Sequence, residues 1–398
     1  MAATPALTKL FKEFFDSEKA GGLILVGCTL ASILVTNSGW GEAWLHFWHT
    51  HLDLSFGSVP LDHSIEHWVN DGLMAIFFLL VGLEIERELY IGELADFKKA
   101  LLPIVAAIGG MLVPAGAHFL FNHGTPTQGG IGIPMATDIA FALGVLSLLG
   151  KKVPASVKIF LTALAIIDDL GAILVIAVFY TKTLSLTWLA FALGIFLLLL
   201  ILNKLKVNKL IFYILPGILM WYCMLRSGIH ATLSGVLLAF AIPFRKDPAV
   251  NPSAVIQHAL HKPVAFMILP LFALANTGIL LSTGWTTSLG SPNSLGILAG
   301  LVIGKPIGIL LCCWLAIRTG ICRLPEDIRW SHLLGLGILA GIGFTMSIFI
   351  TNLAFDHAET IQFSKIAILA ASLLASVLGF GVLSFLSGRQ NAPPSKIH

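Results

Sequence analysis

Charged side chains are scarce in this sequence. Asp, Glu, Lys and Arg together make up 11% of its 398 residues, whereas soluble proteins carry about 25%. Hydrophobic residues reach 57% of the chain. The composition therefore excludes an ordinary soluble protein and predicts a polytopic membrane protein, with the lipid bilayer as its surroundings.

Clusters of basic residues with interleaved aromatics are also missing, and the net charge is only +3. Nucleic acid is therefore not an expected partner. The cysteines are odd in number, and most of them lie in apolar runs: Cys28, Cys223, Cys312, Cys313 and Cys322. We expect small core residues here, not a disulfide framework or a cysteine metal site, and we expect no cofactor.

Twelve apolar runs can be drawn as membrane spans. They predict an all-α membrane protein with about twelve transmembrane helices, organised as a single transporter domain over residues 1–398. The spans are 17–36, 64–88, 101–122, 129–149, 155–180, 187–203, 208–224, 228–243, 258–280, 295–317, 332–355 and 362–386. The seventh and eighth are short, and the cut between them at 226–228 is the least sharply marked.

Loop charges predict the orientation. With the N-terminus in the cytoplasm, 20 of the 24 Lys and Arg residues fall on the cytoplasmic side. The outside then holds only Lys182, Arg226 and Lys365, and Lys305 lies within a span. This bias follows the positive-inside rule and predicts that both termini are cytoplasmic.

The first external loop, residues 37–63, contains no Lys or Arg. Its segment HTHLDLSFGSVPLD alternates in places and contains Gly and Pro, which indicates a small β-hairpin on the outer face. A plain loop is an equal alternative. A hairpin at this position could pair with a second subunit.

Two spans are expected to be interrupted. The fourth has three glycines and Pro134 just before Thr137 and Asp138, and the eleventh has four glycines between residues 335 and 343. Pro removes a backbone donor and Gly weakens a helix. Two interrupted spans at corresponding positions of inverted repeats indicate a transporter binding site. The repeats would be residues 101–180 and 295–386, although the sequence similarity between them is faint.

Two adjacent carboxylates, Asp168 and Asp169, lie at the centre of the apolar run LTALAIIDDLGAILVIAVF. Each charge costs at least about 2.5–3.5 kcal/mol at mid-membrane, so the presence of two adjacent carboxylates there indicates a function. Neighbouring helical residues point about 100° apart and cannot both face one structural partner. Because the two carboxylates also repel each other, they should bind either a small hard cation or protons, in competition.

Asp138 and Lys305 are the other ionisable residues near mid-span. A broken helix leaves free N–H and C=O groups, so Asp138 could face the former and Lys305 the latter. A purely structural role is an open alternative for Asp138. If Lys305 pairs with one of the adjacent aspartates, protonation of that carboxylate breaks the pair, and the two aspartates take different roles.

A second cluster ends the second span, in the sequence GLEIERELYIGEL. Glu84 and Glu88 share a helical face with Arg87, which allows either a solvated helix end or a cytoplasmic cation funnel that responds to pH. His258 and His261 open the ninth span and could join this cluster, because histidine titrates near neutral pH. His230 is similarly ambiguous. For all three histidines the alternative is a polar side chain at the membrane interface with no specific role.

Three other classes of protein fit less well. A proton-coupled carrier of organic solutes needs polar and aromatic lining, which the fourth, fifth and eleventh spans largely lack. An intramembrane aspartyl protease needs two carboxylates, one from each of two helices, on either side of the peptide bond that it cleaves. Asp168 and Asp169 are instead neighbours in one helix. A passive cation channel needs a carbonyl filter or an acidic ring, and a buried lysine argues against it.

Seven motifs together carry a specific resemblance. In chain order they are GLEIERE, ATDIAFALGVLSLLG, LTALAIIDDLGAI, RSGIHATLSG, LPLFALANTG, IGKPIG and GIGFTMSIFI, and they span residues 82–350. The sequence resembles the NhaA family of bacterial sodium/proton antiporters. That family is an established example of an inverted-repeat transporter, and the resemblance implies twelve helices, two of them broken and crossing.

The resemblance also implies roles for individual residues. Asp168 and Asp169 would bind the metal ion (Na⁺ or Li⁺) and protons, with Thr137, Asp138 and Lys305 beside them at the crossing. Five positions would belong to alkaline pH activation: Glu84, Arg87, Glu88, His258 and, as the ambiguous member, His230. Gln257 departs from the acid usual before His258 and puts the pH set-point in doubt.

At the level of the whole protein, the resemblance implies an inner-membrane transporter and not an enzyme. It would export Na⁺ or Li⁺ in exchange for H⁺ by alternating access, and so serve pH and sodium homeostasis. Two titrating carboxylates allow more than one proton per ion, hence electrogenic exchange. A homodimer would form through the external loop, residues 45–62.

Overall fold

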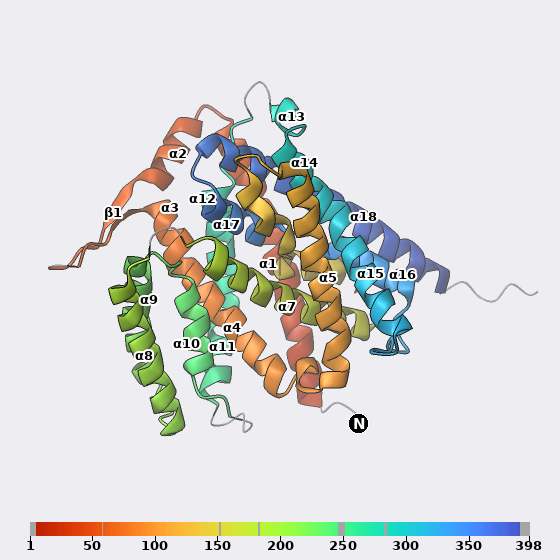
Figure 1. Ribbon diagram of the computed structural model, residues 1–398, viewed down its shortest axis with the longest axis horizontal. Coiled ribbons are helices and arrows are strands. Elements are labelled where there is room, and N and C mark those ends of the chain that lie inside the picture. The colour runs from red at the N-terminus through yellow and green to blue at the C-terminus, as the bar shows by residue number, and fades with distance from the viewer. Residues whose placement is uncertain are drawn as a thin grey trace, which may run out of the picture. The chain divides into compact units, whose positions relative to one another are not determined.

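The computed structural model describes residues 5–57, 59–150, 153–181, 184–245, 251–281 and 285–390, with side chains from residue 20 to 386 within these ranges (Figure 1). The chain forms two compact units. Unit 1 comprises Met1–Leu23, Asp96–Asp169 and Gly284–His398, and unit 2 comprises Ile24–Ala95 and Leu170–Thr283. The helices α1 (Pro5–Thr36) and α7 (Ala155–Phe179) contribute to both.

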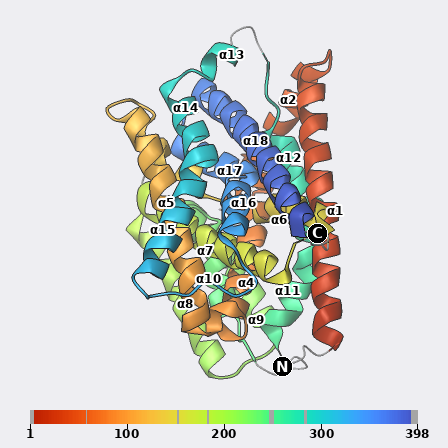
Figure 2. The ribbon, with the colours of Figure 1, turned by 90° about the vertical axis from the view of Figure 1, so that its right-hand side faces the viewer.

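Unit 1 is helical. Besides its parts of α1 and α7 it contains α5 (Phe97–Asn122), η3 (Gln128–Met135), α6 (Ile139–Leu148), α13 (Trp285–Ser288), α14 (Pro292–Leu298), η7 (Ala299–Gly304), α15 (Lys305–Arg318), α16 (Trp330–Ala340), α17 (Phe344–Ala354) and α18 (Ala358–Gln390). The helix α5 lies along α14 and α15, and α18 lies along α14 and α16 (Figure 2). A Cβ atom on Gly109 would lie 2.2 Å from the carbonyl oxygen of Gly308, so glycines let α5 and α15 touch backbone to backbone.

Unit 2 contains the rest of α1 and α7, then α2 (Gly41–His49), β1 (His51–Asp53), β2 (Asp62–Ser64), α3 (Ile65–His67), η1 (Trp68–Leu73), α4 (Met74–Tyr90), η2 (Glu93–Ala95), α8 (Leu186–Lys204), α9 (Ile211–Ser227), α10 (Leu233–Ala241), α11 (Pro252–Pro263), η6 (Val264–Ile268) and α12 (Leu269–Asn276). The helices α4 and α10 pack closely at small residues, since a Cβ atom on Gly235 would lie 2.1 Å from the carbonyl oxygen of Ala75.

Every predicted span coincides with helix in the described residues, which confirms an all-α membrane protein. Eight helical stretches there are long and apolar enough to cross a membrane, and up to ten if two bent pairs each count as one span. The number twelve is therefore not confirmed; α9 is short and α10 has nine residues. The cut between these two lies at Gly228, whose φ of +83° ends α9 in the left-handed conformation.

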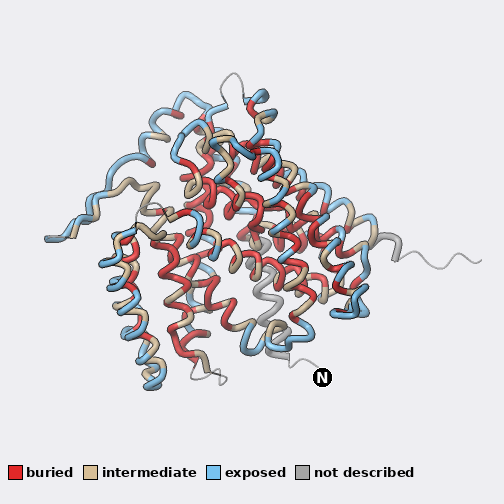
Figure 3. The backbone as a smooth tube through the Cα atoms, in the orientation of Figure 1, coloured by how far each residue is buried: buried red, intermediate tan, exposed pale blue. Residues whose placement is uncertain are grey.

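The helices of this membrane protein differ in how far their side chains are buried. Most of α8 is exposed or half-buried (Figure 3), and Ala192 and Leu199 are its buried residues. Its sequence is nevertheless almost wholly apolar, as expected of a helix that faces lipid. By contrast, α17 is buried from Phe344 to Thr351, although it includes Thr and Ser. Polar residues on such a helix need partners within the protein.

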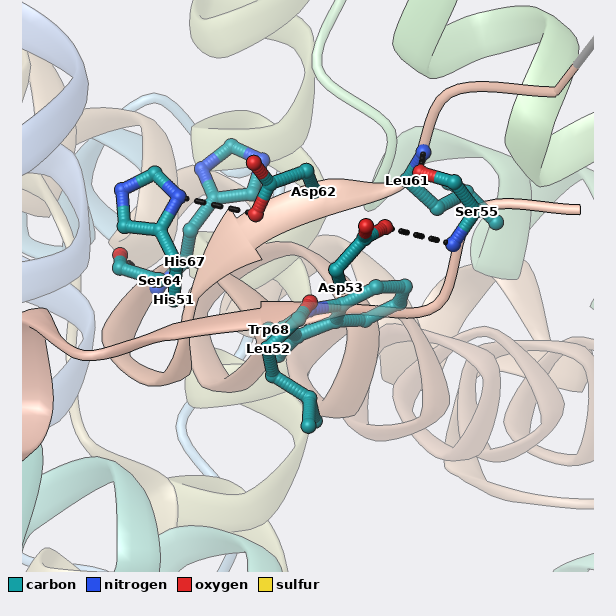
Figure 4. Close-up of polar contacts among 9 residues, drawn as sticks. All are labelled: His51, Leu52, Asp53, Ser55, Leu61, Asp62, Ser64, His67 and Trp68. Carbon is teal, nitrogen blue, oxygen red and sulfur yellow. Dashed lines mark hydrogen bonds and ion pairs between the residues drawn. The ribbon is translucent and has the colours of Figure 1, made fainter.

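The predicted hairpin is present. The strands β1 and β2 are antiparallel, with His51 opposite Ser64, Leu52 opposite His63 and Asp53 opposite Asp62. Asp53 accepts a hydrogen bond from the backbone N–H of Ser55, and His51 reaches Asp62 across the strands at 2.9 Å (Figure 4). The indole of Trp68 donates to the carbonyl of Leu52, which ties the hairpin to η1.

The two predicted repeats share one pattern of elements. In each, a long helix (α5, or α14 to α15) precedes an interrupted helix (η3 to α6, or α16 to α17) and another long helix (α7 or α18). Their inverted relationship, and a single domain over residues 1–398, stay predictions.

Candidate ion-binding site

Two interrupted helices meet in unit 1. The first half-helix η3 ends at Met135, and α6 begins at Ile139 after a short extended segment. The second interruption separates α16 from α17, which are bent by 45° relative to each other. The backbone N–H of Asp138 donates to the carbonyl of Ile342 at 2.7 Å. The predicted breaks are therefore confirmed, and each supplies a polar group that the other lacks.

Asp138 caps two helices at once. One carboxylate oxygen accepts from the N–H of Phe141, in the first turn of α6, at 2.9 Å. The other accepts from the N–H of Thr345, in the first turn of α17, at 3.0 Å, and from the Thr345 hydroxyl. A carboxylate between two helix N-termini complements both dipoles, so the sequence expectation of free N–H groups around Asp138 is met.

Lys305 uses all three of its ammonium protons in this site. Its Nζ donates to the carbonyl of Met135 at 2.5 Å and to the hydroxyl of Thr137 at 2.6 Å, and it pairs with Asp168 at 3.0 Å. The lysine thus compensates both the carbonyl at the broken end of η3 and the Asp168 carboxylate. On its own helix, the π-helical segment η7 directly precedes Lys305, and Pro306 has no N–H to donate to the carbonyl of Val302.

Thr137 connects the two interruptions. Its hydroxyl lies 2.7 Å from Asp168 and 2.9 Å from the carbonyl of Ala340, while it accepts from Lys305. A hydroxyl carries one proton, so Thr137 can donate to Asp168 or to Ala340 but not to both at once. The hydroxyl of Thr137 therefore has two alternative hydrogen bonds, one to the Asp168 carboxylate and one to the carbonyl at the end of α16.

The charged residues of the site are shielded from solvent, with exposed fractions of 0% for Asp168 and Lys305, 1% for Asp169 and 2% for Asp138. Among the described residues, none donates a hydrogen bond to Oδ1 of Asp168. A buried carboxylate oxygen with free lone pairs can take a proton or a hard cation. No group of three or more His, Cys, Asp or Glu that could hold a metal ion occurs in the described part of the chain, so an ion here would also need hydroxyl or carbonyl oxygens.

Sequence reasoning did not single out every residue of the site. Thr345 lies just after the glycine-rich interruption of the eleventh span, as Asp138 lies just after that of the fourth, and this symmetry was the available signal. The carbonyls of Met135, Ala340 and Ile342 carry no sequence signal of their own, since any residue has one.

The cluster at the end of α4 contains an ion pair between neighbouring residues. Arg87 pairs with its neighbour Glu88 at 2.9 Å, and Glu88 also accepts from the backbone N–H of Glu93. The residue that sequence reasoning missed is Glu86, which is 4% exposed and accepts from the hydroxyl of Ser253 at 2.8 Å. This bond joins α4 to the first turn of α11.

One of the predicted histidines lies at that cluster, because His261 of α11 interacts electrostatically with Arg87 and with His258. His258 is exposed on α11. His230 contacts the carbonyl of Tyr180 at 3.0 Å. Since Gly235 of α10 lies beside Ala75, His230 is near the start of α4, away from Glu84 and Glu88.

Known proteins are similar to this chain over nearly its whole length. The family model described as Na+/H+ antiporter 1 matches residues 12–383. A protein of Dechloromonas aromatica is 59% identical over 97% of this chain and 98% of its own length. One of Flavobacterium psychrophilum is 58% identical over 96% and 97%, and one of Citrobacter koseri is 48% identical over 94% and 98%. All three are named Na(+)/H(+) antiporter NhaA. The chain therefore belongs to the NhaA family of Na⁺/H⁺ antiporters.

Proposed function

We propose that this protein exports Na⁺, or Li⁺, across the bacterial inner membrane in exchange for protons. The observation that carries the proposal is the buried Lys305–Asp168 pair, bonded through Thr137 to both interrupted helices. A pair in this environment is stable only while its two charges balance. Anything that protonates Asp168 or brings a cation to it must therefore change the bonds that hold the helix breaks together.

In the proton-loaded form, Asp168 shares its charge with Lys305 and the site needs no metal ion. When Na⁺ enters, it competes with the ammonium for the carboxylate, and the displaced lysine can release its own proton. Asp169, on the next residue of α7, supplies a second carboxylate for the ion or for a proton. We assign ion and proton binding to Asp168 and Asp169, with Thr137, Asp138 and Lys305 as the groups that hold them in place.

Because three ionisable groups share one site, more than one proton can exchange for each monovalent ion. Such exchange moves net charge, so the membrane potential can drive sodium out of the cell. Access alternates between the two sides when the interrupted helices shift, and the single proton of Thr137 gives that shift two discrete hydrogen-bonded arrangements.

We further propose that the cytoplasmic end of α4 sets activation at alkaline pH. Glu84, Arg87, Glu88 and His258 are the assigned residues, with His230 as a separate group near the other end of that helix. Both termini are cytoplasmic, and the hairpin region, residues 45–62, joins two subunits in a homodimer.

A flux measurement in proteoliposomes tests the electrogenic proposal. The purified protein is reconstituted, a potassium gradient with valinomycin imposes a potential, and ²²Na⁺ efflux is followed at equal pH on both sides. Proton-coupled export predicts that an outside-positive potential accelerates efflux and that reversing the sign slows it. An efflux rate that does not depend on the potential would contradict the electrogenic proposal, although electroneutral antiport would remain consistent with it.

A further inference from the structure

Another buried ionisable residue lies in unit 1, away from the paired aspartates. His118 on α5 is 0% exposed. Its Nε2 lies 3.1 Å from Oδ1 of Asn293 at the start of α14, and its Nδ1 has no hydrogen-bond partner among the described residues. An ionisable group inside a membrane span indicates a functional site, and an unpartnered buried nitrogen requires an explanation.

The hydrogen-bond chain around His118 determines its tautomer. Ser364 donates to the carbonyl of Thr360 at 2.7 Å, so its hydroxyl oxygen accepts from the Asn293 amide nitrogen, also at 2.7 Å. The amide oxygen of Asn293 then faces the ring, which requires Nε2 to carry the proton. The neutral ring therefore holds a bare lone pair on Nδ1, which is a proton acceptor within the protein.

The position of His118 relates it to the ion site. A Cβ atom on Gly130, in the first half-helix η3, would lie 3.1 Å from Cε1 of the ring, so the imidazole packs on that half-helix. Two turns earlier on α5, a Cβ atom on Gly110 would lie 3.9 Å from Cε of Lys305. Eight residues of helix span about 12 Å, which is the axial distance between these two levels.

Few other charges face this histidine. The packed elements α14 and η3 contain no ionisable residue. On α5, Lys98 and Lys99 lie at the opposite end of the helix. From α18 and the turn before it, the ionisable groups are Asp356, His357, Glu359, Lys365 and, at the far end of the helix, Arg389. A proton on His118 would therefore act on these groups and on the ion site.

We propose that His118 is a second proton-binding site of the transport unit, near the external end of α5, and that its charge opposes cation binding at Asp168. At an axial separation of about 12 Å and an effective dielectric of about 20, one unit charge changes cation affinity by up to about tenfold. Protonation of His118 at low pH lowers Na⁺ affinity, and deprotonation restores it. The inference rests on the proposed antiport function.

The transport test compares full-length variants in proteoliposomes, with Na⁺-induced currents recorded between pH 5.5 and 9. His118→Gln keeps a donor toward Asn293 but cannot be protonated. Its acid limb is expected to move down by up to about one pH unit, with up to about tenfold more current at pH 5.5 and an unchanged current at pH 8.5. His123→Gln, at an exposed histidine just beyond α5, is the matched control and is expected to keep the native profile.

Ser364→Ala separates protonation from packing. It breaks the hydrogen-bond chain but keeps the imidazole, so we expect lower thermal stability with the native acid limb. If Ser364→Ala shifts the limb as His118→Gln does, or if His118→Gln scales the current equally at every pH, the proposal is wrong.

A second readout does not depend on transport. In protein with ¹⁵N-labelled histidine, the resonance that disappears in His118→Gln is expected to titrate between pH 5 and 9, from a neutral Nε2–H ring to an imidazolium. A resonance that stays neutral throughout overturns the inference even if Na⁺/H⁺ exchange is intact. Absence of exchange in the native protein together with a titrating resonance would instead remove the proposed function.

Discussion

At the residue scale, Lys305 and Asp168 are tolerated in the interior because each supplies the other's counter-charge. Removal of one member of such a pair leaves a buried charge without compensation, which costs about 3–5 kcal/mol. Lys305 also serves the carbonyl of Met135 and the hydroxyl of Thr137, so its loss also removes two charge-assisted hydrogen bonds.

Lys305→Met is therefore expected to destabilise the protein by about 3–5 kcal/mol, and Asp168→Asn in the same chain is expected to recover part of that loss. Thermal unfolding of the purified protein in detergent, at pH 7.5, measures both. Equal melting temperatures for the native protein and the lysine variant would show that the pair contributes little.

Thr345 provides a narrower test of the Asp138 contact. Thr345→Val keeps the shape and the backbone N–H donor but removes the hydroxyl, and a lost hydrogen bond to a carboxylate is worth about 1.5–3 kcal/mol. Na⁺-dependent exchange is expected to fall roughly tenfold or more, whereas Thr345→Ser should stay near native. Dye-detected exchange in vesicles compares the two, and similar losses in both would assign the effect to packing.

At the element scale, the crossing depends on close approach of backbones. A Cβ atom on Gly341, in the second interruption, would lie 2.3 Å from the carbonyl oxygen of Leu301 in η7. A Cβ atom on Gly300, also in η7, would lie 2.7 Å from the ring of Pro134. Small residues therefore let η7 reach both interrupted helices, which explains why glycines accumulate in these motifs.

Gly341→Ala is expected to force these elements apart and to cost about 1–3 kcal/mol, with loss of exchange. Gly381→Ala on α18 is the control, because nothing lies within 4 Å of a Cβ atom there. Melting temperatures and Na⁺ exchange are measured for both. A tolerated change at Gly341 would mean that the interruption does not need its present geometry.

The hairpin of β1 and β2 provides a test that depends on pH. Burial lowers the pKa of His63, and the positive charge of His67 lowers it further. A histidine with a depressed folded pKa stabilises the fold above its unfolded pKa of about 6.5, and that stability is lost as the pH falls through the folded value. The pKa of Asp53, lowered by its hydrogen bonds to Ser55, acts in the same direction at still lower pH.

Hydrogen exchange of residues 51–64 is therefore expected to accelerate when the pH falls from 8 to 5, after correction for the intrinsic rate. His63→Phe keeps the ring contacts with His67 and Trp68 but removes the titration. It should reduce the acceleration, and an unchanged acceleration in this variant would locate the effect elsewhere.

At the scale of the whole molecule, much of the fold follows from sequence because lipid leaves few choices. Apolar length predicts the spans, and proline and glycine beside Thr137 predict the first interruption. Asp138 and Lys305 could be assigned to opposite helix ends, since broken helices expose N–H groups at one end and carbonyls at the other.

The remainder could not be predicted because it depends on tertiary contacts. Nothing in the sequence says that Lys305 pairs with Asp168, since that depends on how α15 and α7 lie around the crossing. Glu86 resembles its neighbours Glu84 and Glu88 in sequence, and only its contact with Ser253 distinguishes it. The partner of His118 is likewise 175 residues away in the chain.

The central claim is that cation and protons compete at the paired aspartates, and one measurement tests it most directly. Everted membrane vesicles are energised until acidic inside, and a pH-sensitive dye reports the gradient while Na⁺, Li⁺ or K⁺ is added between pH 6.5 and 8.5. The account predicts that Na⁺ and Li⁺ collapse the gradient of the native protein at alkaline pH and leave that of Asp169→Asn unchanged. A native protein that responds to no monovalent cation, or an Asp169→Asn variant that responds like the native one, would contradict it.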